Sequence, residues 1–138
     1  MHHRAAVTAL LAAACLALAG CGSSSGKADS KPSPSKTASK ADRFLRAVHD
    51  ANFTSWQDKG PTDEELLEYP QQWCDGLDAG HSVQWMFDAT GGGGLYPIGE
   101  TWGTYKAEAN EVLVMAVKVY CPANLAAVKD ELRASGDY

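Results

Sequence analysis

The sequence predicts an all-α fold, a small bundle of about four to five helices with one disulfide, in residues 41–138 of the 138-residue chain. Apolar residues recur at the three- and four-residue spacing of helices, and residues that favour helix starts precede these stripes. No stretch alternates apolar and polar residues in the manner of a half-buried strand. The hydrophobic content of 45% supports one small core, so we expect one domain with appendages.

The first helix is expected to begin after Ser39. Ser39 is a suitable N-cap, Asp42 stands three residues later, and Asn52 can close the helix in the left-handed conformation. The apolar stripe of this helix consists of Phe44, Leu45, Val48 and Ala51. A connecting segment that contains Phe53 and Trp56 is expected to follow.

The second helix is expected to open at Thr62. Glu65 occupies the capping-box position, and Asp63 and Glu64 fill the first turn, where the helix dipole stabilises carboxylates. These acidic residues are therefore explained without an acid/base pair. Pro70 either kinks this helix or opens a second helical piece. The second piece would contain Trp73, Cys74, Leu77 and a terminating Gly80.

Ser82 is a suitable cap for a third helix, which is followed by the four glycines Gly91–Gly94. The apolar face of this helix consists of Val83, Met86 and Phe87. A phosphate-binding loop needs a Lys followed by Ser or Thr at the start of a helix, and the next Lys is Lys106. The glycines are therefore expected to form a flexible loop.

The longest helix is expected from about residue 104 to residue 120 and is apolar on nearly all sides, which is typical of a helix at the centre of a fold. Its main stripe consists of Tyr105, Ala109, Val112, Leu113, Ala116, Val117 and Tyr120. Cys121 and Pro122 end this helix. Asn124 is a suitable N-cap for a short last helix that Gly136 can terminate.

Residues 1–20 have the pattern of a secretory signal peptide. A polar start with Arg4 precedes an apolar run from Ala5 to Ala19 that only Thr8 interrupts. This run is shorter than the roughly 20 apolar residues that a membrane-spanning helix needs. The residues before Cys21 resemble the lipobox of bacterial lipoproteins, and they are Leu18, Ala19 and Gly20.

The lipobox resemblance implies that Cys21 is lipidated with a diacylglycerol and becomes the new N-terminus. Two acyl chains anchor a protein stably, whereas one chain gives only marginal membrane binding. Cys15 fits the pattern less well, because Ala12 stands three places before it. Two alternatives remain open: an ordinary signal peptide cut near Ala19 or Gly20, which would give a secreted product, and a simple transmembrane anchor.

Residues 21–40 are expected to be the lipidated cysteine and a disordered tether, because they are rich in Ser, Lys and Pro. Residues 22–40 hold four Lys and one Asp, a net charge of +3. Residues 41–138 hold seven Lys and Arg against sixteen Asp and Glu, a net charge of −9. A basic tether favours an anionic membrane surface, and an acidic domain disfavours nucleic acid.

Two cysteines remain in the expected mature domain, Cys74 and Cys121, once Cys15 is removed and Cys21 is lipidated. Disulfides persist outside the cytoplasm, and an even pair in a small exported domain is expected to bridge. A redox or metal role would need a close cysteine pair or a histidine at ligand spacing, and the sequence has neither. We therefore expect a disulfide between Cys74 and Cys121.

A set of short motifs between about residues 42 and 122 resembles the "domain of unknown function 732" family of exported actinobacterial proteins. The matching residues are Phe44, Leu45, Val48, Phe53, Cys74, Leu77, Gly80, Ser82, Ala116, Tyr120, Cys121 and Pro122. The resemblance implies a small helical domain, secreted or lipid-anchored, with its two cysteines paired. The chain departs from the family at Asn52, where the family often has Gly, and in its tail after Pro122. The family carries no established activity.

No catalytic motif stands out, so we expect no enzymatic activity, no metal site and no cofactor. His49 and His81 lack a Ser, Cys or Asp partner at a diagnostic spacing. Glu108 and Glu111 share a helix face, but no His accompanies them, so a solvated acidic face is expected. Several other Trp and Tyr residues of the domain also need an explanation: Trp56, Tyr69, Trp73, Trp85, Tyr96, Trp102 and Tyr105. Core packing is expected to explain most of them, and a few could line an apolar groove.

The sequence thus favours a lipoprotein anchored on the extracytoplasmic face of the cell membrane, with a non-catalytic binding or interaction module of the cell envelope. The expected partners are the membrane, through the lipid anchor, and an unknown envelope protein or small ligand, but no nucleic acid. The alternative is a carrier of a haem-like or apolar small molecule, with His49, His81 or Tyr96 as candidate ligands.

The substitution Cys21→Ser is expected to release the protein from the membrane fraction or to leave it uncleaved, because the thiol that accepts the lipid is lost. Cell fractionation and the mass of the N-terminal peptide check this outcome. Cys15→Ser is the matched control and should leave the attachment unchanged. Normal processing and membrane attachment of the Cys21→Ser protein would contradict the lipobox interpretation.

Overall fold

The computed structural model describes residues 38–97 and 102–137, all within one compact unit, Lys36–Tyr138. Its elements are α1 (Lys40–Ala51), the 3₁₀ turn η1 (Thr54–Trp56), α2 (Asp63–Leu67), α3 (Tyr69–Asp78), α4 (Val83–Phe87), α5 (Lys106–Tyr120), the 3₁₀ turn η2 (Pro122–Asn124) and α6 (Leu125–Ser135). No strand occurs in these two ranges, so the expected all-α fold is confirmed. The expected signal peptide and Cys21 lie outside them.

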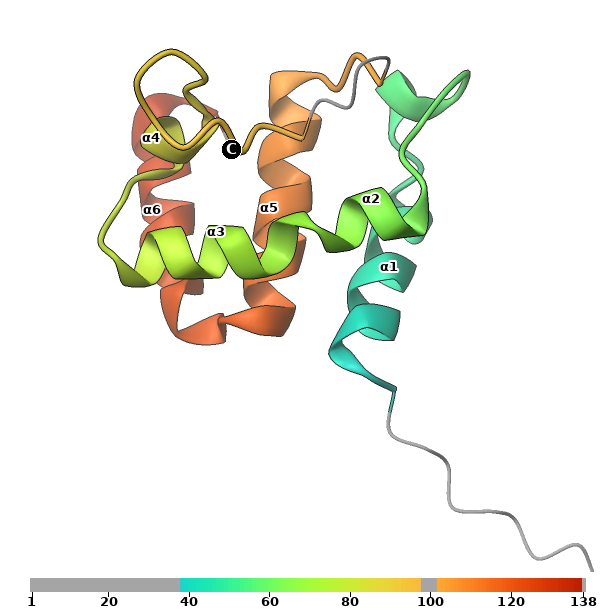
Figure 1. Cartoon of the computed structure of the whole chain (residues 1–138), viewed down its shortest axis with the longest axis horizontal. Helices are drawn as coiled ribbons and strands as arrows, with labels where there is room; N and C mark the ends of the chain where they lie inside the picture. The colour runs from blue at the N-terminus through green and yellow to red at the C-terminus, as the bar shows by residue number, and fades with distance from the viewer. Residues whose placement is uncertain (1–37, 98–101, 138) are drawn as a thin grey trace, which may run out of the picture. The chain divides into compact units, whose positions relative to one another are not determined.

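Helix α5 lies at the centre of the domain, with α1 and α6 on either side and α3 crossing it (Figure 1). Its buried residues are Ala109, Asn110, Val112, Leu113, Val114, Ala116 and Val117. These positions cover most of the circumference of the helix, so α5 needs apolar partners on several sides. The expectation of a buried central helix is confirmed.

Helix α1 begins with the capping box that the sequence predicted. The Ser39 side chain accepts the Asp42 N–H, the Asp42 carboxylate accepts the Ser39 N–H, and these hydrogen bonds lower the pKa of Asp42. Asn52 closes the helix in the left-handed conformation with φ 50°. The Lys40 ammonium donates to the Tyr120 carbonyl at 2.9 Å, which satisfies the last turn of α5.

Helices α2 and α3 follow each other with only Glu68 between them. Thr62 and Glu65 form the expected capping box at the start of α2. Pro70 lies in the first turn of α3, where its missing N–H removes no intrahelical bond. Of the two alternatives that the sequence left open, the structure therefore has the second helical piece. Trp73 is fully buried on the face of α3 that packs against α5.

The disulfide between Cys74 and Cys121 is present and confirms the predicted pairing, with an S–S distance of 2.03 Å. It connects the middle of α3 to the residue that ends α5. The two cysteines are 47 residues apart, so the bridge closes a long loop of the unfolded chain.

Helix α4 is short and packs closely against α3. The Ser82 side chain caps it by accepting the Trp85 N–H at 3.0 Å, as predicted. A Cβ atom added to Gly76 would lie 2.8 Å from the sulfur of Met86, which is fully buried. The glycine therefore permits the close approach of the two helices, a contact that the sequence analysis did not anticipate.

The segment Gly91–Gly94 differs from the flexible open loop that the sequence suggested. The Gly93 N–H donates to the Trp85 carbonyl at 2.9 Å, and the Leu95 N–H donates to the Met86 carbonyl at 2.7 Å. A Cβ atom added to Gly92 would lie 2.0 Å from the Trp85 carbonyl oxygen. The glycines therefore allow the chain to fold back against the end of α4.

One further expectation is wrong, and another holds only in part. Tyr105 was expected on the buried stripe, but α5 begins at Lys106, and Tyr105 is the N-cap and 60% exposed. Asn124 occupies the N-cap position of α6 as expected, but its side chain makes no capping hydrogen bond. Its side-chain amide donates instead to the Asp78 carboxylate at 2.8 Å.

Reduction of the Cys74–Cys121 disulfide is expected to lower the free energy of unfolding by about 4 kcal/mol through the larger entropy of the unfolded chain. Each kcal/mol lowers the Tm of a domain of this size by roughly 4–8 °C. Thermal unfolding with and without reductant measures the effect, and the Cys74→Ala/Cys121→Ala variant should not respond to reductant. An equal Tm for the oxidised and reduced protein would contradict this prediction.

Candidate functional site

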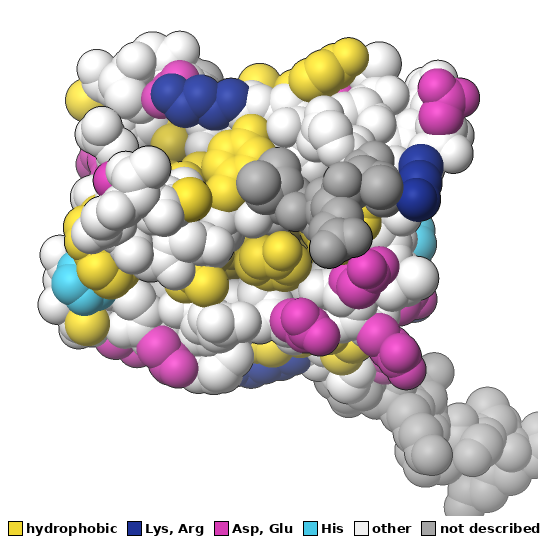
Figure 2. Space-filling model, turned by 45° about the horizontal axis from the view of Figure 1, so that its top comes forward, with side chains coloured by type: hydrophobic (Ala, Val, Ile, Leu, Met, Phe, Trp, Pro, Cys, Tyr) yellow, Lys and Arg dark blue, Asp and Glu magenta, His cyan; other side chains and the backbone are white. Residues whose placement is uncertain are grey.

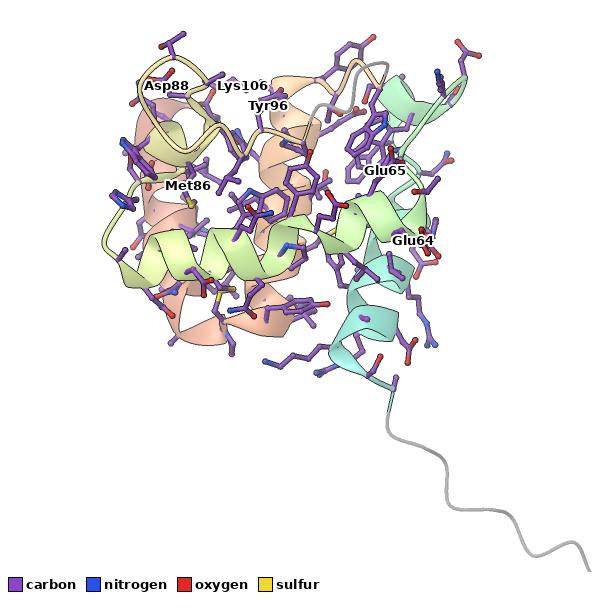
Figure 3. All side chains as sticks on the ribbon, viewed as in Figure 1. Glu64, Glu65, Met86, Asp88, Tyr96 and Lys106 are labelled. Atoms are coloured by element: carbon purple, nitrogen blue, oxygen red, sulfur yellow. A yellow bond between two sulfur atoms is a disulfide. The ribbon has the colours of Figure 1, made fainter. Side chains whose placement is uncertain are left out.

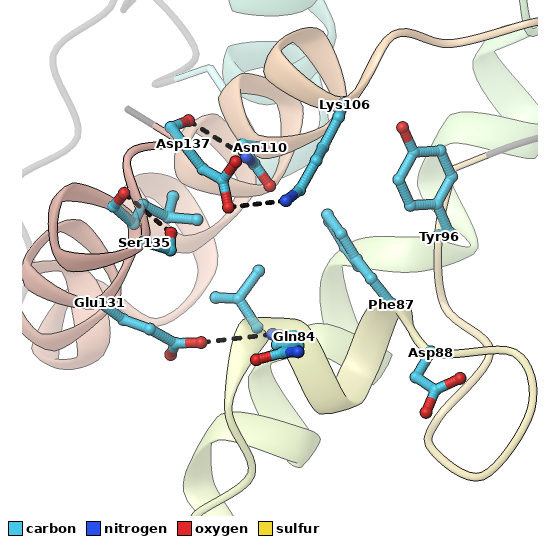
Figure 4. Close-up of a pocket in the computed structure, with 11 residues that line it drawn as sticks. Gln84, Phe87, Asp88, Tyr96, Lys106, Asn110, Glu131, Ser135 and Asp137 are labelled. Carbon is cyan, nitrogen blue, oxygen red and sulfur yellow. Dashed lines mark hydrogen bonds and ion pairs between the residues drawn. The ribbon is translucent and has the colours of Figure 1, made fainter.

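A cavity of about 480 Å³ lies between α4, α5, α6 and the segment that follows α4 (Figure 4). The residues that line it are Val83, Gln84, Phe87, Asp88, Tyr96, Lys106, Asn110, Glu131, Leu132, Ser135 and Asp137. Its volume is within the range of small-ligand sites, which are about 300–1,000 Å³. The cavity is therefore the candidate binding site of the domain.

One side of the cavity is aromatic. The rings of Phe87 and Tyr96 meet edge to face, with centroids 5.0 Å apart. The Tyr96 hydroxyl donates to the Thr104 carbonyl at 3.1 Å. Burial raises the pKa of Tyr96, and the carboxylate of Glu108 raises it further, so the hydroxyl stays protonated at neutral pH.

The opposite side of the cavity is polar, and the turn that ends α6 at Gly136 brings Asp137 to it. Gly136 takes a left-handed conformation with φ 77°, and the Asp137 N–H donates back to the Leu132 carbonyl at 2.8 Å. This turn places the Asp137 carboxylate 2.8 Å from the Lys106 ammonium. The Asn110 amide donates to the Asp137 carbonyl at 3.1 Å. Side chains of α5 therefore bind both the carboxylate and the backbone carbonyl of Asp137.

The carboxylates of the cavity differ in their partners. The hydrogen bond from Lys106 lowers the pKa of Asp137, which keeps it ionised at neutral pH. One oxygen of Glu131 accepts the Gln84 backbone N–H at 3.2 Å, near the start of α4. Asp88 also lines the cavity, on the side of Tyr96 in Figure 4, but its carboxylate accepts the Thr90 N–H and hydroxyl within its own turn.

The three candidate ligands of a haem-like molecule, His49, His81 and Tyr96, do not meet in one place. His49 contacts the Asp63 carboxylate at 2.8 Å and lines a second cavity, of about 400 Å³, between α1 and α2. The His81 ring stacks on Trp85 at a centroid distance of 3.6 Å and lines neither cavity. Only Tyr96 of the three lines the first cavity. No group of three or more metal-binding side chains occurs in the part of the chain that the structure describes.

Glu108 and Glu111 were expected to form a solvated acidic face, and this expectation holds for Glu111 but is wrong for Glu108. The Glu108 carboxylate accepts the N–H groups of Thr54 and Ser55, at 2.7 and 3.1 Å, and the Ser55 hydroxyl. It thus caps the start of η1 and connects this turn to α5. Glu111 is exposed. Glu64 and Glu65, at the start of α2, lie at the other end of the domain from the first cavity (Figure 3).

Most aromatic side chains pack against one another, as expected. Ring contacts join Phe53, Trp56, Trp102, Tyr69, Trp73, Phe87 and Tyr96. The last two rings of this row form the aromatic side of the cavity. Figure 2 shows hydrophobic side chains gathered in the middle of the face that it presents, so apolar surface reaches the exterior of the domain there.

A comparison with protein families matches residues 40–123 to the family described as "Protein of unknown function (DUF732)". The chain belongs to the DUF732 family. The resemblance proposed from the sequence is thereby confirmed. No curated protein and no solved structure matches the chain significantly.

The DUF732 match runs from α1 to η2 and includes both cysteines of the disulfide. It ends before α6, so Glu131, Leu132 and Asp137 lie outside it. The polar side of the cavity is therefore built partly from Lys106 and Asn110, within the matched part, and partly from a segment beyond it. The helices described here do not include one that is long and apolar enough to cross a membrane.

The cavity was not predicted from the sequence, because its polar residues come from separate elements. Lys106 and Asn110 are one turn apart on α5, a spacing that marks one face of a helix. Nothing in the sequence pairs that face with the residue after Gly136. The DUF732 domain thus has a candidate site that only the three-dimensional arrangement shows.

The substitution Glu108→Ala is expected to lower the free energy of unfolding of the DUF732 domain by about 1–2 kcal/mol, because it removes a helix cap. Glu111→Ala, at an exposed position of the same helix, should change it by less than about 0.5 kcal/mol. Denaturant unfolding measures both values. An equal effect of the two substitutions would show that the cap does not stabilise the fold.

Proposed function

We propose that the protein is a lipoprotein anchored on the extracytoplasmic face of the membrane, whose DUF732 domain is a non-catalytic binding module. The observation that carries the binding role is the cavity of about 480 Å³ between α4, α5 and α6, with its aromatic and polar sides. The described residues that line it include no histidine or cysteine. Several of its polar groups already form structural hydrogen bonds, which favours binding over catalysis.

The lipid anchor is supported by the sequence before Cys21, which resembles a lipobox. The structure begins the domain one residue earlier than the sequence predicted, because Lys40 is already in α1 and Ser39 is its N-cap. The 17 residues from 22 to 38 would span at most about 60 Å when fully extended and roughly 23 Å on average as a flexible coil. A tether of this length would hold the domain close to the membrane surface. The acidic domain would then meet solutes of the envelope and not nucleic acid.

The geometry gives less support to a carrier of a haem-like molecule. His49 and His81 lie away from the cavity, and Tyr96 keeps its proton because its pKa is raised. A haem ligand of the tyrosine type acts as a phenolate, which burial disfavours. A carrier of a small apolar molecule remains compatible with the aromatic side of the cavity.

The protein purified from its native membrane is expected to carry a small molecule, which native mass spectrometry detects as added mass. Gln84→Trp should remove the added mass, because the Gln84 side chain is exposed at the cavity and a larger one would obstruct it. Gln71→Trp, at an exposed position of α3 outside the cavity, is the matched control.

Loss of the added mass in the Gln84→Trp protein alone supports the cavity as the binding site. Wild-type protein that carries no added mass from its native membrane would contradict the proposed function. Equal ligand occupancy in wild type and both variants would place the ligand elsewhere and would contradict the assignment of the site.

A further inference from the structure

The cavity has two chemically different sides that face each other. The carboxylates of Glu131 and Asp137 lie on one side, and the rings of Phe87 and Tyr96 lie on the other (Figure 4). The Asp88 carboxylate lies on the aromatic side, where it accepts the Thr90 N–H and hydroxyl. A molecule that fills the cavity would contact anionic groups at one end and apolar surface at the other. The two ends therefore select for a ligand with a polar and an apolar part.

The anionic side has more negative than positive charge. Lys106 is the one cation among the described residues that line the cavity, and its ammonium is 2.8 Å from the Asp137 carboxylate. Glu131 brings a second carboxylate, and the Gln84 N–H that it accepts carries no formal charge. A positive group of the ligand at Glu131 would balance this carboxylate through a charge-assisted hydrogen bond.

The aromatic side offers a surface for a flat or aliphatic group. Phe87 and Tyr96 meet edge to face at 5.0 Å, and Val83 and Leu132 complete the apolar lining. Aromatic rings attract apolar groups through burial. The apolar part of the ligand is therefore expected on this side, and its charged part at the carboxylates.

We infer that the cavity binds a small amphipathic amine, with its ammonium group at Glu131 and its apolar group against Phe87 and Tyr96. This inference rests on the proposed function, because it names the ligand class of the same cavity. An anionic ligand would be repelled by the three carboxylates of the lining, Asp88, Glu131 and Asp137. A neutral apolar ligand would bury the Glu131 carboxylate without balancing its charge.

Three probe molecules of similar size test the charge requirement on the intact lipoprotein in detergent micelles. They are phenethylamine, 2-phenylethanol and 3-phenylpropionate. Phenethylamine is expected to shift the backbone NMR signals of Phe87 and Leu132, and to bind roughly tenfold more tightly than either of the others, because it alone places a cation at the carboxylates.

Glu131→Gln isolates the charge, because its amide oxygen can still accept the Gln84 N–H. This variant is expected to bind phenethylamine roughly tenfold more weakly than wild type. Glu111→Gln removes the same charge at an exposed position of α5 outside the cavity, and its affinity should equal that of wild type. Equal binding of phenethylamine by the Glu131→Gln and wild-type proteins, or equal binding of 2-phenylethanol and phenethylamine, would overturn the inference.

Two different outcomes distinguish an error in the amine assignment from an error in the proposed binding function. A native ligand that Gln84→Trp displaces but that carries no amine would overturn the amine assignment and leave the binding role intact. Protein that carries no ligand from its native membrane would overturn the binding role itself.

Discussion

The burial of α5 on several sides is the constraint on which the rest of the fold depends. A helix that is apolar around most of its surface must be covered, and α1, α3 and α6 each provide an apolar stripe for this purpose. The Cys74–Cys121 disulfide and the Lys40 ammonium hold the C-terminal end of α5. Glu108 connects the N-terminal half of α5 to η1.

The cavity follows from a change in character at the N-terminal end of α5. Lys106 and Asn110 interrupt the apolar surface there, and both bond to Asp137 instead of packing against apolar side chains. Asn110 is buried and needs a hydrogen-bond partner, which the Asp137 carbonyl provides, so polar groups meet at this end of α5. The same end receives the aromatic pair of Phe87 and Tyr96, which is why a polar and an aromatic side face each other.

Local chemistry made most of the fold predictable. The capping boxes at Ser39 and Thr62, the N-cap at Ser82 and the terminating Gly136 depend on neighbouring residues, and all four are present. The disulfide was predictable because only two cysteines remained after the expected processing. The caps depend only on neighbouring residues. The disulfide is a long-range contact, but the sequence leaves only one possible pairing for it.

The features that were missed depend on tertiary contacts. Gly91–Gly94 folds back on the carbonyl groups of α4, although four glycines in sequence suggest only freedom. Asn124 is the N-cap residue of α6, but its side chain donates to Asp78 of α3 and not to the backbone of α6. The cavity unites α4, α5 and α6 with the turn after Gly136, and no local pattern relates these segments. For the same reason, the sequence suggested His49 and His81 as ligands but not Glu131.

A crystal structure of the protein purified from its native membrane tests most directly whether the domain is a binding module. The account predicts electron density for a bound molecule between α4, α5 and α6, in contact with Glu131 and with the ring of Phe87. A cavity that is closed by protein side chains, or that contains water alone, would contradict it.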